Sequence, residues 1–170
     1  MIIVAWLGEL IGLAIAATSD VRSRIIPDRV VLLLAANGLA LRLAMAGWYQ
    51  AVISLLAAGA ILLVLGQAAR HGLLGAGDAK LIAAVALFVP VADVPALVLA
   101  IALAGGVVSC AYLALRAMAR HGAMFGPLCR EQRRIAAGLP LPYALAIFLG
   151  TGWLGVADLL RCFSATRCSF

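Results

Sequence analysis

The ten residues His71–Lys80 read HGLLGAGDAK, and they interrupt a chain that is otherwise almost continuously apolar. Three glycines, an aspartate and a lysine stand here between two long runs of Leu, Ala, Val and Ile. An ionisable side chain at the edge of a membrane span is energetically costly, and for that reason it is a candidate functional residue. Asp78 is therefore the first candidate site residue, and the apolar runs around it decide the fold class.

The composition predicts a protein that is embedded in a lipid bilayer. Of its 170 residues, 66% are hydrophobic and 12% are charged, and the mean hydropathy is +1.14. A soluble domain is about half apolar and about a quarter charged. Because a chain of this length cannot bury so much apolar surface within itself, we expect lipid to cover the remainder.

Six apolar runs approach the length of about 20 residues that is needed to cross the bilayer. We predict spans at Ile2–Thr18, Val30–Ala46, Ala51–Ala69, Ala79–Val89, Ala96–Met118 and Leu141–Leu160. The fourth run is short, and we expect its neighbours to shield it. The predicted fold class is all-α: a polytopic membrane protein with about six transmembrane helices in one bundle, forming a single domain over residues 1–170.

The basic residues predict how these helices cross the membrane. Ten of the thirteen follow the first, third and fifth runs: Arg22, Arg24, Arg29, Arg70, Lys80, Arg116, Arg120, Arg130, Arg133 and Arg134. Basic loops stay in the cytoplasm, so we expect both termini on the periplasmic side. Asp20 then lies on the same cytoplasmic face as Asp78. The bases are not interleaved with aromatic residues, so we expect no nucleic-acid partner.

Two carboxylates at one membrane depth suggest acid–base catalysis. Asp20 follows the first span, where the helix dipole disfavours an acid; the alternative is a solvated loop acid paired with Arg22 or Arg24. Asp78 could instead be the N-cap of the fourth span. Two such groups that approach closely cannot both ionise, so one can take a proton from water while the other donates to a scissile carbonyl. The sequence leaves open which acid plays which role.

The residues around the two acids have supporting roles in this interpretation. Glycine can adopt a positive φ or let a ligand approach the backbone, so we expect Gly75 and Gly77 to make room for a substrate chain. Pro27 and Asp28 suit the start of the second span, the latter as an acid at a helix N-terminus. Lys80 either neutralises the neighbouring acid or faces the lipid headgroups.

Three further charges, Glu9, Arg42 and Asp158, fall within the predicted spans. An unpaired charge in lipid is costly, so we expect an ion pair, either Glu9–Arg42 or Asp158–Arg42. The same charges suit a different class of protein, a small channel or transporter subunit whose intramembrane charges line a path. The two acids at one face, rather than strung across the membrane, favour an enzyme.

The sequence offers little support for metal or nucleophile chemistry. His71 and His121 are expected in loops, without the three or four ligands that a metal site needs. None of the four cysteines forms a CxxC pair, although Cys162 and Cys168 could form a disulfide on the oxidising side. No Gly-x-Ser-x-Gly motif occurs. We therefore expect neither a metal nor another cofactor.

Two motifs in this chain resemble those of the type IV prepilin peptidases, a family of membrane aspartic proteases. Gly75-Ala76-Gly77-Asp78, with Lys80, is similar to the family's GxGD motif. Asp20 followed by Ile26-Pro27-Asp28 is similar to the family's first motif. Both motifs occur in order, each at a cytoplasmic span boundary, and the resemblance covers the chain up to the sixth span. It implies that Asp20 and Asp78 form the catalytic pair.

The resemblance also implies a substrate and a setting. The expected substrate is a prepilin or pseudopilin, cut between a short basic leader and a hydrophobic helix at the cytoplasmic face of the bacterial inner membrane. Larger members carry an added N-terminal region, often with paired CxxC motifs, that is linked to methylation of the new N-terminus. This chain enters its first span directly and is similar to the short form of Flp (tight-adherence) pilus systems, so we expect proteolysis without methyl transfer. A preflagellin-type peptidase is the alternative within this class, and the oligomeric state is left open.

Overall fold

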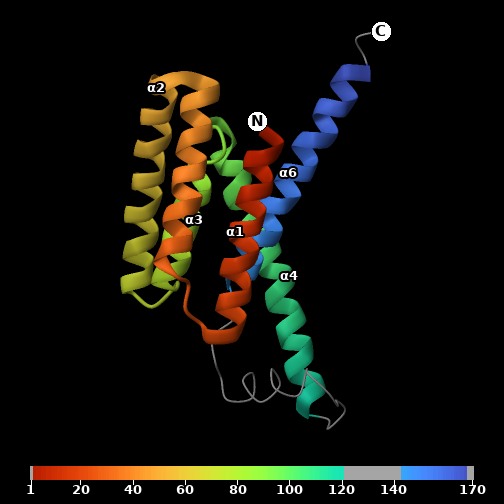
Figure 1. Ribbon diagram of the computed structural model, residues 1–170. Coiled ribbons are helices and arrows are strands. Elements are labelled where there is room, and N and C mark those ends of the chain that lie inside the picture. The colour runs from red at the N-terminus through yellow and green to blue at the C-terminus, as the bar shows by residue number, and fades with distance from the viewer. Residues whose placement is uncertain (1, 121–142, 168–170) are drawn as a thin grey trace.

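The chain folds into a bundle of helices (Figure 1), without a strand among the residues that the structure describes. This computed structural model describes residues 2–120 and 143–167. Its elements are α1 (Ile2–Ser23), α2 (Asp28–Arg70), α3 (Ala76–Ala86), the 3₁₀ turn η1 (Val91–Asp93), α4 (Val94–Arg120) and α6 (Tyr143–Arg167). The all-α class predicted from the apolar runs is confirmed.

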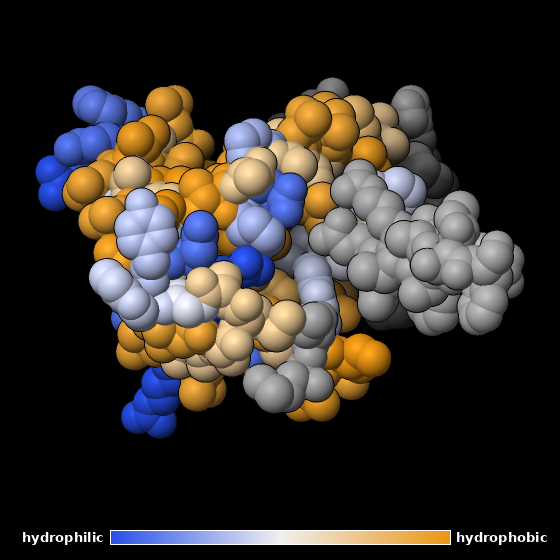
Figure 2. All heavy atoms as spheres, turned by 90° about the horizontal axis from the view of Figure 1, so that it is seen from above, coloured by the Kyte–Doolittle hydropathy of each residue, from blue (hydrophilic) through white to orange (hydrophobic). Residues whose placement is uncertain are grey.

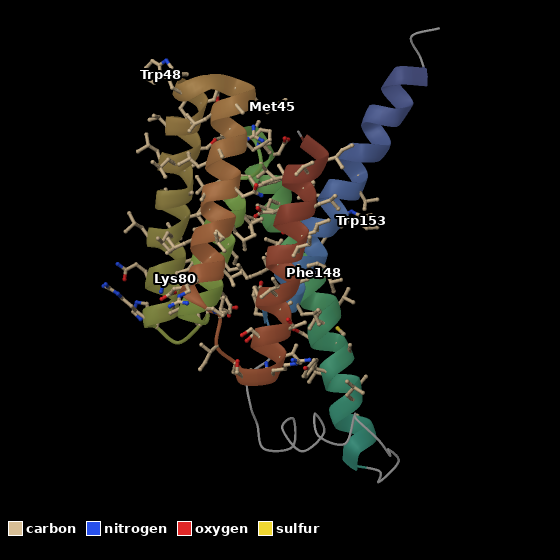
Figure 3. All side chains as sticks on the ribbon, viewed as in Figure 1. Met45, Trp48, Lys80, Phe148 and Trp153 are labelled. Carbon is tan, nitrogen blue, oxygen red and sulfur yellow. The ribbon has the colours of Figure 1, made fainter. Side chains whose placement is uncertain are left out.

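The longest helix, α2, folds back on itself at Gly47. This residue has φ 78° and ψ 175°, a backbone conformation that glycine adopts far more readily than other residues. Figure 1 shows the two arms of α2 running side by side from this turn. Trp48 points away from the bundle beside it, as Figure 3 shows. The two arms correspond to the spans predicted at Val30–Ala46 and Ala51–Ala69.

Within the part of the chain that the structure describes, three helical segments are long and apolar enough to cross a membrane: Ile3–Ser23, Asp28–Arg70 and Val91–Leu115. The predicted count of six spans is therefore not confirmed. The folded α2 counts once in this list, and the apolar stretch Tyr143–Ala157 of α6 falls short of the required length. Helix α3 has 11 residues, or about 16 Å of helix, against a hydrocarbon layer of about 30 Å.

The outward faces of these helices are apolar. Leu32, Leu63 and Trp153 are 68%, 73% and 73% exposed, and Figure 2 shows apolar side chains around much of the rim of the molecule. A soluble monomer rarely exposes a contiguous apolar surface of this extent. The exposed faces and the long apolar helices together identify a membrane protein.

Helix α3 forms the centre of the bundle. Every residue from Leu81 to Val89 is buried, which is the pattern of a segment surrounded on all sides. Helices α2 and α6 pack against α3, and Trp6 of α1 packs edge to face on Phe88 with ring centroids 4.6 Å apart. The predicted fourth span is thus short and shielded by its neighbours, as expected.

Glycines let neighbouring helices approach closely at two of these contacts. A Cβ at Gly38 of α2 would lie 2.8 Å from the backbone nitrogen of Phe88. A Cβ at Gly150 of α6 would lie 2.7 Å from the Cα of Ile101 in α4. Such close contacts at small residues are typical of helix packing in membranes, and they fix α6 against α4 and α2 against the end of α3.

Candidate active site

Asp20 and Asp78 come from different helices and lie at the same end of the bundle. Asp20 is in the last turn of α1, and Asp78 is in the first turn of α3. Figure 1 shows the end of α1, the loop between α2 and α3, and the start of α6 together at this end. The site is therefore built from three parts of the chain.

Asp20 belongs to a helix rather than to a loop. Helix α1 continues past the predicted end at Thr18 to Ser23. It closes at Arg24, which has φ 57° and whose N–H bonds to the carbonyl oxygen of Asp20 at 2.9 Å. The hydroxyl of Ser19 donates to the carbonyl oxygen of Ile25 at 2.8 Å, so the loop that follows is tied to the turn that carries the acid.

The start of α6 provides a partner for the Asp20 carboxylate. The N–H of Ala144 donates to Asp20 Oδ2 at 3.2 Å, and the Asp20 side chain is only 7% exposed. Amide groups in the first turn of a helix lack intrahelical partners and carry the positive end of the dipole. They offset the unfavourable dipole at the end of α1. The alternative of a solvated loop acid is wrong, because the side chain is buried.

The segment that precedes Asp78 ends one helix and begins the next. Helix α2 finishes in a Schellman motif, in which Gly72 has φ 74° and the N–H groups of Gly72 and Leu73 each bond to a carbonyl of the last turn at 3.0 Å. Gly75 is the N-cap of α3, with φ −70°. In this segment it is Gly72 that adopts the positive φ, whereas the expected role of Gly75 and Gly77 in making room for a substrate chain stays a prediction.

Gly75 makes room for the Asp78 carboxylate. Asp78 is the third residue of α3, so its interpretation as the N-cap is wrong. Its carboxylate accepts a hydrogen bond from the Gly75 N–H, which is the reciprocal bond of a capping box. A Cβ at Gly75 would lie 2.5 Å from Asp78 Oδ2. Any side chain at position 75 would displace the carboxylate from this bond.

The two sequence motifs contact each other at two points beside the acids. A Cβ at Gly77 would lie 3.3 Å from Ile26 Cδ1, so this glycine lets the loop before α2 pack on α3. Lys80 Nζ binds Asp28 Oδ1 at 2.8 Å, near the start of α2 (Figure 3). Lys80 therefore pairs with Asp28 rather than with the neighbouring Asp78, and its orientation toward lipid headgroups stays a prediction. Asp28 opens α2 directly after Pro27, as predicted for an acid at a helix start.

The two aspartates interact electrostatically. The pKa of Asp78 is raised to about 6, mainly by burial and further by the charge of Asp20, whereas the hydrogen bond from Gly75 acts in the opposite direction. The raised pKa favours the protonated form of the Asp78 carboxyl, beside the Asp20 side chain that accepts the Ala144 N–H. Such a pair can remove a proton from one atom and deliver a proton to another.

The predicted ion pair within the spans is not formed by Glu9 and Arg42. Arg42 donates from Nη2 and Nε to the carbonyl oxygen of Phe88 at 2.8 and 3.3 Å, a group just past the end of α3 that this helix leaves available. Glu9 is fully buried and accepts a hydrogen bond from Asn37 Nδ2 at 3.0 Å. The Glu9–Arg42 pair is therefore wrong. The side chain of Asp158 lies outside the described residues.

The other polar candidates of the sequence lie partly outside the described residues. His71 is exposed. His121 lies outside the described residues, as do the side chain of Cys162 and all of Cys168. Within residues 2–120 and 143–167, no three His, Cys, Asp or Glu side chains lie together in a way that could hold a metal ion.

The fold and the site together define a membrane protein that carries a pair of interacting, largely buried carboxylates at one end of a helical bundle. The sequence profile of the type IV leader peptidase family matches residues 8–110, a segment that makes up more than half of the chain and contains both acids. The chain belongs to this family, as the two motifs indicated, and protease activity follows in general terms from the membership. No curated protein and no solved structure matches it.

Proposed function

We propose that this protein is an aspartic endopeptidase that removes the leader peptide from prepilins or pseudopilins of the Flp (tight-adherence) type. Asp20 and Asp78 are the catalytic pair. The observation that carries the proposal is the electrostatic interaction of these two acids, which come from α1 and α3. Both lie inside the segment that matches the leader peptidase family.

The surroundings of the two acids support different roles for them. Asp20, which accepts the Ala144 N–H at the start of α6, is the base that takes a proton from the attacking water. Asp78, with its pKa of about 6, is the acid that donates a proton to the scissile carbonyl oxygen. When the tetrahedral intermediate breaks, Asp20 returns its proton to the leaving amine and the re-forming carbonyl gives its proton back to Asp78. Neither step uses a metal or a cofactor.

The charge distribution supports a cytoplasmic site in the bacterial inner membrane. Arg22, Arg29 and Arg70 flank the end of the bundle that carries the acids, and basic loops remain in the cytoplasm. In this orientation both chain termini are periplasmic. Residues 1–170 then act as one domain that crosses the bilayer about six times, with the two arms of α2 counted separately.

The channel or transporter alternative rests on Glu9, Arg42 and Asp158. Glu9 accepts a hydrogen bond from Asn37, and Arg42 donates to the carbonyl oxygen of Phe88, so these two side chains have structural partners within the bundle. The side chain of Asp158 lies outside the described residues. A preflagellin-type substrate would use the same catalytic pair, so a comparison of substrates separates it from the prepilin proposal.

Cleavage by the purified protein in liposomes tests the proposal. The substrate is a full-length Flp-type prepilin, a preflagellin serves as the parallel substrate, and mass spectrometry locates the cut. We expect the prepilin to be cut at the end of its leader, at a rate that EDTA leaves unchanged. Faster cleavage of the preflagellin would reassign the substrate. Loss of activity with EDTA and its recovery with a divalent cation would contradict the aspartic mechanism, and an uncut prepilin would overturn the proposed function.

A further inference from the structure

An apolar groove opens between the second arm of α2 and helix α4. Its volume is about 420 Å³, within the range of about 300–1,000 Å³ that is common for ligand sites. Helix α3 contributes Ile82 to its lining. The groove lining includes Ile61, Leu65, Leu74, Ile82, Ala102 and Tyr143. Apart from the Tyr143 hydroxyl, these lining side chains are apolar, so the groove suits an apolar occupant.

Two residues that line this groove lie beside the groups that hold the catalytic candidates. Leu74 immediately precedes Gly75, whose N–H binds Asp78. Tyr143 immediately precedes Ala144, whose N–H binds Asp20, and the Tyr143 side chain interacts electrostatically with Asp78. Leu74 and Tyr143 are therefore each adjacent in sequence to a residue whose N–H binds one of the two acids.

A glycine in α4 seats the tyrosine at this position. A Cβ at Gly105 would lie 3.2 Å from Tyr143 Cε2 and 3.4 Å from the Tyr143 hydroxyl oxygen. The ring therefore lies directly against the α4 backbone. A side chain at position 105 would push the ring away from α4, so Gly105 helps to keep the groove open at Tyr143.

We propose that this groove binds the apolar segment of the substrate that adjoins the scissile bond; the proposal rests on the proposed function. A chain that presents one carbonyl to both acids must pass through space that borders both. Leu74 and Tyr143 place the groove beside the groups that hold both acids, and its apolar lining matches the part of a prepilin-type substrate that lies in the bilayer. The leader on the other side of the bond then leaves the bilayer at the end of the bundle that carries the two acids.

A second apolar groove provides an internal comparison. It has a volume of about 480 Å³ and lies between the two arms of α2 and the outer side of α3, where Leu55 and Leu62 line it. Its polar residues are Asp28 and Lys80, which bind each other. The second groove is thus similar in size and character, but none of its lining residues is adjacent in sequence to Gly75 or Ala144, so we expect no substrate segment in it.

Photocrosslinking tests the assignment without relying on cleavage. The photoreactive residue benzoylphenylalanine replaces Ala60 or Ala102 in the first groove, or Leu55 in the second, in full-length protein that also carries Asp78→Asn. The probe is a full-length Flp-type prepilin in the same liposomes. We expect adducts from positions 60 and 102 to the first apolar residues after the cut, and at most a background signal from position 55. Adducts to lipid alone, adducts to a second copy of the enzyme, or equal yields from position 55 would overturn the proposal.

A kinetic comparison separates this proposal from the proposed function. Ala102→Trp fills the groove and should raise KM for the prepilin by about tenfold or more with a smaller change in kcat. Leu103→Trp alters the adjacent, 64% exposed residue of the same helix and should leave both constants unchanged. If the wild-type protein cleaves the prepilin and the two variants behave alike, the groove assignment fails alone. If the wild-type protein does not cleave it, the proposed function fails.

Discussion

Replacing Gly75 with alanine tests whether this glycine makes room for the Asp78 carboxylate. The backbone at Gly75 has φ −70° and ψ 138°, which alanine adopts without strain. The added methyl group would lie 2.5 Å from Asp78 Oδ2, whereas ordinary contacts of a Cβ begin at 3.4 Å. The carboxylate must therefore retreat by about 0.9 Å, the difference between these two distances.

This displacement predicts a large loss of rate and a small loss of stability. A misplacement of about 1 Å costs a catalytic group about 100-fold in rate, so we expect kcat to fall by about that factor. Loss of glycine at a helix N-cap costs at most about 1 kcal/mol. In the wild type, the hydrogen bond from the Gly75 N–H lowers the pKa of Asp78. The retreat of the carboxylate weakens this bond. The pKa of Asp78 should then rise, and the residual activity should persist to higher pH than in the wild type.

The assay is prepilin cleavage in liposomes as a function of pH, with thermal unfolding measured in detergent. Gly66→Ala is the matched control, because a Cβ there meets nothing within 4 Å; its kcat should equal that of the wild type. Gly77→Ala should have an intermediate effect, since its Cβ would meet the flexible end of Ile26 at 3.3 Å. A Gly75→Ala variant with wild-type kcat and an unshifted pH profile would refute the reasoning.

The remaining predictions concern pH, the exposed ion pair and the buried glutamate. Because the pKa of Asp78 is raised to about 6, its proton is present below that pH and is lost above it. The value of kcat/KM should therefore fall by about tenfold per pH unit above pH 6. A profile that stays flat from pH 5 to 8 would contradict the role of Asp78 as the acid. Asp28→Asn removes the ion pair with Lys80, whose side chains are 48% (Lys80) and 72% (Asp28) exposed. Unfolding measurements should therefore give a loss of stability of at most about 1 kcal/mol, with kcat within a few-fold of the wild type. A loss of activity as large as that of Asp78→Asn would put Asp28 in the site. Glu9→Gln keeps an acceptor for Asn37, while Glu9→Leu removes it. The leucine variant should therefore be less stable by about 1–3 kcal/mol in a thermal unfolding assay. Equal stability of the two variants would argue against the buried hydrogen bond.

The fold class was predictable because the apolar runs are long and sharply interrupted. Length and hydropathy alone indicate helices, and the turn at Gly47 separates two runs as expected. The number of membrane-crossing helices was not predictable in the same way. From Leu81 onward helix α3 is apolar all round and buried in protein, and an apolar composition does not distinguish burial in protein from exposure to lipid.

The candidate site was predictable where it depends on contacts between residues that are close in sequence. The spacing in Gly75–Asp78 reflects a bond within one helix turn, so the motif carries the signal in its own sequence. Partners that depend on tertiary packing left no such signal. The Ala144 N–H that binds Asp20 is a backbone group, which any residue but proline supplies. For the same reason the sequence did not indicate the partner of Lys80, which is an acid on another helix, Asp28, rather than the nearby Asp78.

The most direct test of the central claim is the cleavage of a co-expressed Flp-type prepilin by the wild type, Asp20→Asn and Asp78→Asn, with the amount of each enzyme in the membrane measured in parallel. The asparagine side chain is close in size to aspartate but can neither take up a proton as a base nor release one as an acid. The account predicts that the wild type shortens the prepilin and that both variants accumulate the full-length precursor at normal enzyme abundance. Processing at the wild-type rate by either variant would contradict the assignment of Asp20 and Asp78 as a catalytic pair.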